Sequence, residues 1–286
     1  MIPRAPAQCP LINRWLSTGA ADHSFRVLVP LLMLLGVLSA GIGEGQAAGP
    51  STLKPPLKVL FLTGGGYHDY EKLAPHLTKG ISQIVNATFE VRFDLEALRD
   101  AKFADRFDAI LYDMCFDEVA DEILENALRA AKNGKPSVMI HCAVHAFRRS
   151  PKIREWETCC GMRSKVHDPF GPFAVEKLDV QSPITKLFPN DWKTPGDELY
   201  QTISIEPQSR PLLRAKSPKD GREHVVCWTY QYGRGRVFAT TLGHDMKTAA
   251  SPDYLKLVSN GLLWACDKLD PDGRPTSGFA APQPKP

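Results

Sequence analysis

The sequence predicts an α/β protein in which helices cover both faces of a mostly parallel sheet. Three observations lead to this fold class. Short, continuously apolar segments recur along the chain, as is typical of strands buried on both faces. Amphipathic segments of helical length alternate with them, which is the pattern of βαβ units. Polar residues follow several of the predicted strands, at the edge where open α/β sheets bind ligands.

The first predicted strand covers residues 59–62 and is followed, after Thr63, by three consecutive glycines at positions 64–66. Glycines let the backbone turn sharply and approach a ligand closely, although a simple strand-to-helix loop explains them equally well. No Gly-Lys-Ser/Thr follows, so the segment is not a phosphate-binding loop. The next residues are Tyr67, His68 and Asp69.

The first half of the chain continues the alternation of strands and helices. Apolar residues at helical spacing, such as Leu73, Leu77 and Ile81, predict the first helix, and Asn133-Gly134 suits the end of the second. In order, we expect a helix at 71–85, strands at 88–93 and 108–114, a helix at 119–131 and a strand at 136–142.

The second half begins with a segment, residues 148–172, that shows no regular pattern. Such a long irregular segment is usually functional, so we expect a lid or rim near the site. A final amphipathic helix is expected at 253–269, with Asp253 as its N-cap. Between them we expect a helical turn at 184–188 and strands at 173–178, 197–200, 212–215, 225–230 and 236–242.

Both ends of the chain differ from this central α/β domain, which covers residues 57–269. Residues 1–48 read as a signal peptide with an apolar core at 27–42, which predicts a periplasmic or extracellular protein. An uncleaved membrane anchor is the alternative, although the apolar segment is shorter than the roughly 20 residues of a membrane span. Residues 49–56 are expected to be a linker, and the Pro-rich residues 270–286 a disordered tail.

The charge of the chain argues against a polyanionic partner. Loss of residues 1–48 lowers the formal net charge from +3 to +2, and no stripe of Lys and Arg is present. Nucleic-acid binding is therefore not expected. We expect a small-molecule or oligosaccharide substrate instead. Membrane contact is expected only if the signal peptide stays uncleaved and acts as an anchor. The oligomeric state is left open.

The chain has seven cysteines, and six remain once cleavage of the signal peptide removes Cys9. Cys115, Cys227 and Cys266 lie in apolar segments, so we expect them to be small buried hydrophobic residues. Cys159 or Cys160 could form a disulfide after export, but the sequence does not reveal its partner.

Three histidines, His68, His141 and His244, lie at or just beyond the ends of predicted strands. If those strands are parallel, their side chains converge in one crevice. Such a cluster can bind Zn²⁺ or another divalent metal, or supply a general acid and base. A hydrogen-bonded or surface histidine is the alternative at each position. Further polar residues lie beside them or approach from the second half: Asp69, Asp245, His145, Asp197 and Glu198.

Cys142 is a candidate nucleophile, because it follows a buried strand as the nucleophile of a sharp strand-to-helix elbow does. The neighbouring His141 could lower the pKa of its thiol. The glycines that usually flank such an elbow are missing, however, and a buried or pocket-lining thiol is the alternative.

Several motifs together resemble the trehalose-utilisation (ThuA-like) family, over about residues 57–269. These are residues 63–69 (Thr-Gly-Gly-Gly-Tyr-His-Asp), 141–143 (His-Cys-Ala), 197–200 (Asp-Glu-Leu-Tyr), 227–237 and 242–245 (Leu-Gly-His-Asp). The resemblance implies a flavodoxin-like three-layer α/β/α sandwich of the class I glutamine-amidotransferase-like superfamily. Glutamine hydrolysis is not expected, because the Gly-x-Cys-x-Gly elbow and the downstream His-x-Glu of true amidotransferases are absent.

The resemblance further implies an exported protein of carbohydrate catabolism that acts on trehalose-type or keto-sugar glycosides. Hydrolase, lyase and isomerase chemistry stay open, and a non-catalytic sugar-binding or accessory module is the alternative. The candidate catalytic residues are His68, His141, His244, Asp69, Asp245 and Cys142, and the same three histidines are the candidate metal ligands. The candidate substrate-binding residues are Gly65, Gly66, Tyr67, Glu198, Trp228 and Tyr230.

Overall fold

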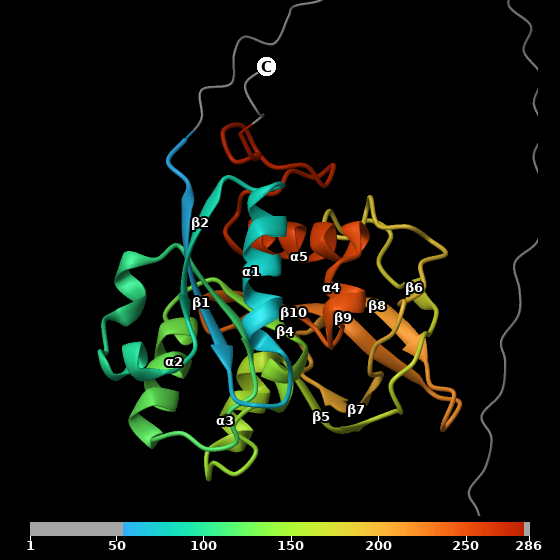
Figure 1. Ribbon diagram of the computed structural model, residues 1–286, viewed down its shortest axis with the longest axis horizontal. Coiled ribbons are helices and arrows are strands. Elements are labelled where there is room, and N and C mark those ends of the chain that lie inside the picture. Colours follow the sequence, from blue (N-terminus) through green and yellow to red (C-terminus); the bar gives the residue numbers. More distant parts are fainter. Residues whose placement is uncertain (1–53, 283–286) are drawn as a thin grey trace, which may run out of the picture. The chain divides into compact units, whose positions relative to one another are not determined.

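A computed structural model of the protein describes residues 54–282 (Figure 1). The expected signal peptide at 1–48 lies outside the described residues, as do most of the expected linker and the last four residues of the chain. Within the described range, no helix combines the length and the apolar character that crossing a bilayer requires.

The centre of the described domain is an eight-stranded sheet with the strand order β2-β1-β3-β4-β10-β9-β8-β6. The first five strands in this order run parallel, and β9, β8 and β6 extend the sheet with antiparallel pairs. In chain order the strands are β1 (Leu57–Gly64), β2 (Ala87–Arg92), β3 (Ala109–Met114), β4 (Ser137–Ile140), β6 (Val175–Lys177), β8 (Arg210–Lys216), β9 (Glu223–Tyr232) and β10 (Gly235–Thr240).

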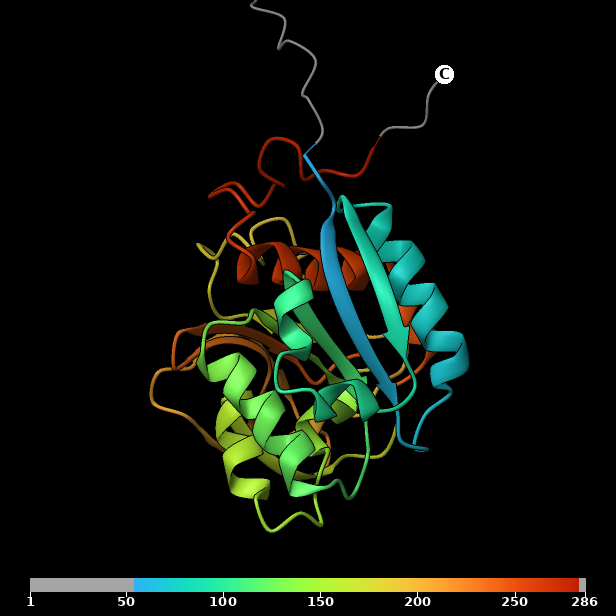
Figure 2. The same cartoon turned by 90° about the vertical axis from the view of Figure 1, so that its left-hand side faces the viewer.

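Helices cover both faces of this sheet, which confirms the predicted three-layer α/β/α fold (Figure 2). Helices α1 (Tyr70–Ser82), α4 (Met246–Ala249) and α5 (Pro252–Ala265) pack on one face, and α2 (Asp121–Lys132) and α3 (Ile153–Cys160) on the other. Strand β1 shows why its sequence is apolar throughout. Val59 and Phe61 enter the first core and Leu60 and Leu62 the second, so neither face tolerates a polar residue.

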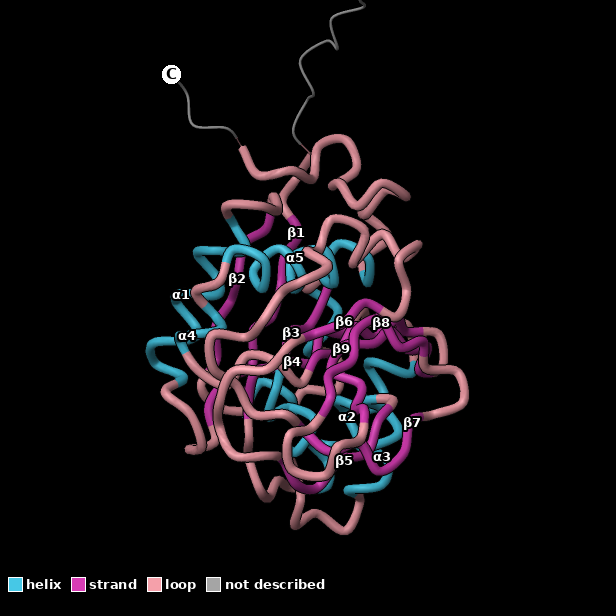
Figure 3. Tube along the Cα trace, turned by 90° about the vertical axis from the view of Figure 1, so that its right-hand side faces the viewer, coloured by secondary structure: helices cyan, strands magenta, loops and turns pink. Residues whose placement is uncertain are grey.

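The segment expected to be irregular, residues 148–172, contains helix α3 and strand β5 (Met162–His167). Trp156, Cys159 and Cys160 are fully buried and lie at i, i+3 and i+4, so they form one apolar stripe of α3. Charged residues lie between these three, so the sequence pattern did not predict a helix here. Strand β5 pairs antiparallel with β7 (Tyr200–Ile205) in a separate two-stranded sheet (Figure 3).

Three short 3₁₀ helices complete the domain: η1 (Glu96–Arg99), η2 (Phe103–Arg106) and η3 (His141–His145). The disorder expected beyond Asp270 is wrong for residues 270–282, which pack against the domain. Phe279 is buried in the first core, and its carbonyl accepts a 2.9 Å hydrogen bond from the backbone N–H of Asn86. The Asn86 side chain also donates to the carbonyls of Lys54 (2.8 Å) and Gly278 (3.1 Å), so it joins both ends of the domain.

Candidate functional site

Three histidine rings meet at the carboxyl edge of the parallel part of the sheet. His68 follows β1, His141 follows β4 and His244 follows β10, and these strands run in one direction. The ring centroids lie 4.9 Å (68–141), 4.7 Å (68–244) and 5.3 Å (141–244) apart. One ring nitrogen from each histidine lies within 4.8 Å of the other two. The convergence expected from the sequence is therefore present, and we call these residues the three-histidine cluster.

Two glycines shape the loops that carry these histidines. Gly65 has φ +103°, and a Cβ there would lie 2.3 Å from the backbone carbonyl carbon of Cys115. Gly243 has φ +112°, and its Cβ would lie 2.2 Å from the hydroxyl of Tyr254. Both positions therefore require glycine for backbone conformation and close packing. Gly66 has open space where its side chain would be, so it lies at the surface of the loop.

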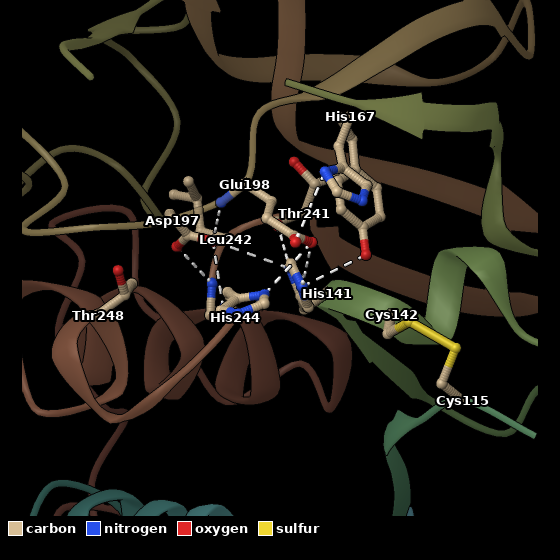
Figure 4. A network of polar contacts seen from close by, with 12 residues as sticks. Cys115, His141, Cys142, His167, Asp197, Glu198, Thr241, Leu242, His244 and Thr248 are labelled. Atoms are coloured by element: carbon tan, nitrogen blue, oxygen red, sulfur yellow. Dashed lines mark hydrogen bonds and ion pairs between the residues drawn. A yellow bond between two sulfur atoms is a disulfide. The ribbon is translucent and has the colours of Figure 1, made fainter. Parts of the chain in front are cut away.

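His141 is held in one tautomer by the backbone. Its Nδ1 lies 2.6 Å from the carbonyl oxygen of Thr241, which can only accept, so Nδ1 carries the proton and donates. In the neutral ring the lone pair is therefore on Nε2, which lies 3.5 Å from the carboxylate of Glu198 (Figure 4). The same atom lies 3.3 Å from the hydroxyl of Tyr200. A histidine whose second nitrogen donates to a carbonyl is typical of metal ligands.

The Glu198 carboxylate lies among three histidines. It is 3.5 Å from His141 Nε2, 3.3 Å from His244 Nδ1 and 3.6 Å from His167 Nδ1 (Figure 4). Burial acts to raise the pKa of Glu198, but the contacts with His141 and His244 outweigh it and hold that pKa below its usual value. Glu198 is therefore an anion at neutral pH. The sequence placed Glu198 near the site but did not indicate His167. Nothing in the local pattern around His167 predicts that its ring lies beside Glu198.

Asp197 fixes the loop that carries His244. Its buried carboxylate accepts hydrogen bonds from the backbone N–H groups of Gly243 (2.8 Å), His244 (3.2 Å) and Glu198 (2.9 Å). Burial is the main cause of a raised pKa for Asp197, and the His141 charge and these N–H groups oppose the rise. Asp197 thereby ties the segment before β7 to the end of β10.

The histidines of the cluster differ in their electrostatics. Burial, followed by the nearby charges of His141 and His244, lowers the pKa of His68 to about 3, so its ring is neutral with a free lone pair. Burial also acts to lower the pKa of His141, but Glu198, Asp197 and the Thr241 carbonyl raise it above the ordinary value. The Nδ1 atom of His244 is buried and, although near Glu198, lacks the alignment of a hydrogen bond.

The cluster opens into a cavity of about 420 Å³, which we call the central cavity. This volume lies in the range of small-molecule sites, roughly 300–1,000 Å³. A second cavity of about 400 Å³, the side cavity, shares the lining residues His145, Arg148 and Lys165 with it. The central cavity is lined by Tyr67, His68, Cys142, His145, Arg148, Lys165, Val166, His167, Glu198, Tyr200, Lys219 and His244.

Cys142 lines the central cavity but has no thiol, because it forms a disulfide with Cys115. The proposal of a Cys142 nucleophile is therefore wrong, and so is the expectation that Cys115 is an unpaired buried residue. The two cysteines follow the adjacent strands β3 and β4, and their Cα atoms are 5.4 Å apart. Cys159 and Cys160, the expected disulfide candidates, are unpaired and buried in α3.

Asp69 and Asp245 serve as helix caps and lie outside the lining of the central cavity. Asp69 caps α1 by accepting from the backbone N–H of Lys72 (3.3 Å), and Asp245 caps α4 by accepting from that of Lys247 (2.8 Å). Both line a different, smaller cavity. Their position beside the histidines in the sequence suggested a catalytic role, but an aspartate at this position is typical of helix starts.

Trp228 and Tyr230 also lie away from the central cavity. Trp228 is fully buried, and its indole N–H donates to the carbonyl of Cys160 at 2.8 Å. Tyr230 is 9% exposed and packs in the second core. Strand β9 is covered by neighbours on both edges, so its aromatic residues stabilise the interior. The aromatic residues that do line the cavity are Tyr67, which is 51% exposed, and Tyr200.

Comparison with known proteins agrees with this architecture. The model of the ThuA family, described as trehalose utilisation, matches residues 58–265. A ThuA-like protein from Parabacteroides merdae superposes with a TM-score of 0.63 at 22% identity, over 79% of this chain and 96% of the other. A ThuA-like protein from Bacteroides uniformis gives 0.65 at 16% identity, over 80% and 99%. These two structures support the α/β fold of this chain. No curated protein matches.

Proposed function

This chain belongs to the ThuA family of trehalose-utilisation proteins, and we propose that it is a carbohydrate-active enzyme that uses a divalent metal ion. The observation that carries the proposal is the three-histidine cluster, whose nitrogens lie within 4.8 Å of one another and of which His68 and His244 line the central cavity. The proposed substrates are trehalose-type or keto-sugar glycosides. The family supports this class, and a cavity of about 420 Å³ is large enough for a small sugar.

The residues of the cluster fit a zinc ion. Three histidine ligands that leave a further position open are a common catalytic zinc set. The His141 tautomer is fixed by a backbone carbonyl, as in metal-ligating histidines. His244 Nδ1 is buried without a hydrogen bond, and a metal ion would satisfy it. A bound ion would act as a Lewis acid that polarises a hydroxyl or carbonyl oxygen of the sugar.

The protein's own side chains supply the proton chemistry of this proposal. Glu198 lines the central cavity as an anion and would accept or return a proton at a sugar hydroxyl. Burial raises the pKa of Tyr200 well above its usual value, so its phenol stays protonated. With His141 Nε2 bound to the metal ion, the Tyr200 O–H would be released from that nitrogen and could donate to the substrate. Asp197 keeps His244 and Glu198 in place through their backbone N–H groups.

The non-catalytic sugar-binding alternative has less support. Such a module would need exposed aromatic residues on which sugar rings stack, and two of the candidate substrate-binding residues, Trp228 and Tyr230, are buried in the interior. The clustering of titratable groups around the histidines favours catalysis instead.

Export remains part of the proposal. The Cys115–Cys142 disulfide supports it, because disulfides persist in the periplasm and outside the cell but are rare in the cytosol. Cell fractionation of the native host tests this proposal. We expect immunodetection to find a shortened chain in the exported fraction. Full-length protein confined to the cytosol would contradict it.

The experiment that tests the enzymatic proposal combines elemental analysis with turnover of trehalose and 3-keto-disaccharides. We expect about one zinc per chain and loss of turnover after chelation. His68→Gln and His244→Gln should lose both metal and turnover. His76→Gln is the matched control, because His76 lies outside the cluster and its ring hydrogen-bonds to the Ala249 carbonyl at 3.1 Å. Metal-free wild type, or cluster variants as active as wild type, would refute the proposal.

A further inference from the structure

We propose that the substrate of this site carries an anionic group, a phosphate or a carboxylate, which binds where the central and side cavities meet. The binding groups are Arg148, Lys165 and His145, the residues that line both cavities. This inference rests on the proposed function, because it names the class of sugar that the three-histidine cluster receives.

The geometry of the two cavities defines the position of this group. Their volumes are about 420 Å³ and 400 Å³, and three shared lining residues place them next to each other. A ligand whose reacting end faces the cluster would therefore place its other end against the shared residues. A disaccharide, or a sugar with a charged substituent, has the length to reach both parts.

The charge of the lining favours an anion. Lys165 and Lys219 line the central cavity, and neither has an ion-pair partner among residues 54–282. Arg148 adds a third cation, whose Nε is 2.9 Å from Asp117. The one carboxylate in that lining is Glu198, which is already surrounded by histidines.

The lining of the side cavity also has more positive than negative charge. Its one acidic residue, Glu157, contacts two arginines, Arg154 at 2.6 Å and Arg163 at 3.5 Å, so its charge is already compensated. Clefts lined by one sign of charge concentrate oppositely charged ligands. A neutral sugar would leave Lys165 without a counter-charge, whereas an anionic substituent would supply one.

His145 provides an independent observation at the same place. Its side chain is 9% exposed, and its Nε2 atom has no hydrogen-bond partner. The ring is stacked on Tyr200, with 4.0 Å between centroids and 9° between planes, which fixes its orientation. Burial, followed by the charge of His141, lowers its pKa to about 3, so the neutral ring can offer one N–H. A buried polar nitrogen without a partner is rare, and a ligand oxygen would satisfy it.

Calorimetric titration with glucose, glucose 6-phosphate and glucuronate tests the inference on the full chain. We expect wild type to bind at least one of the two anionic sugars about tenfold more tightly than glucose at low salt. This preference should shrink in 0.5 M salt, since screening weakens exposed ion pairs. The tighter of the two anions identifies phosphate or carboxylate as the preferred group.

Substitutions locate the anion. Lys165→Gln should weaken binding of the preferred anionic sugar about fivefold, the size of one exposed ion pair, and lower the preference for that anion over glucose by about the same factor. Lys102→Gln is the matched control, because Lys102 is exposed and lines neither cavity. Lys165 is itself exposed, so loss of folding is not expected, and the melting temperature checks this.

Equal affinity for the three sugars would overturn the inference, as would an anion preference that Lys165→Gln leaves intact. The zinc content of the same samples separates this outcome from failure of the proposed function. Wild type that holds zinc and turns over neutral sugars but shows no anion preference refutes the anion site alone. Wild type without zinc that still prefers the anionic sugar refutes the metal proposal alone.

Discussion

We expect Asp113 to make the protein less stable as the pH rises, and Asp113→Asn to remove this effect. Asp113 lies at the end of β3, is 2% exposed, and has a carboxylate oxygen, Oδ2, without a hydrogen-bond partner. Burial raises its pKa from 3.8 to about 7, and the charge of His141 only partly opposes the rise. The folded state therefore prefers the protonated carboxyl.

The magnitude follows from the linkage between proton binding and folding. The pKa is higher in the folded state, so the stabilising contribution is complete below pH 3.8 and is lost as the pH rises to about 7. A shift of about three pKa units corresponds to about 4 kcal/mol in total. Between pH 5.5 and pH 8.5, the remaining loss is about 2 kcal/mol.

Urea unfolding of wild type and Asp113→Asn at pH 5.5 and pH 8.5 measures this loss. Asparagine cannot ionise, so the stability of the variant relative to wild type should increase by about 2 kcal/mol between the two pH values. Comparing the two proteins at each pH removes the contribution of the titrating groups that do not interact with Asp113. An unchanged difference between them at the two pH values, with equal m-values, would refute the argument that burial dominates the titration of Asp113.

Three further predictions concern the scaffold of the site. Asp197→Asn should weaken zinc binding about 10- to 100-fold in equilibrium titration, because the loop of His244 loses its charged acceptor; unchanged affinity would show that this carboxylate does not position the cluster. Cys115→Ser with Cys142→Ser should lower the unfolding free energy by about 3.5 kcal/mol, from a loop of 27 residues. Turnover should survive in that variant, and its loss would reopen a role for sulfur. Trp228→Phe should destabilise the fold by about 1 kcal/mol through the lost bond to Cys160, while sugar affinity stays at the wild-type value.

The convergence of the histidines could be predicted because it follows from strand direction. Consecutive residues such as Val59 and Leu60 are apolar, and their side chains point to opposite faces of the strand. Both are buried only when both faces of the sheet are covered. Covered sheets of this kind are largely parallel, and parallel strands end at one edge. Any polar residue that follows such a strand, such as His68, therefore lies at that edge.

The sequence alone thus determined the fold class, the edge at which the site lies and the three histidines that share it. Only the tertiary structure decided which neighbours join them. The pairing of Cys115 with Cys142 depends on β3 and β4 being adjacent, and the burial of Trp228 depends on β9 lying inside the sheet. Glu198 reaches the histidines because Asp197 binds the loop after β10. Local patterns report how each segment is buried, whereas these contacts depend on the order in which distant segments pack.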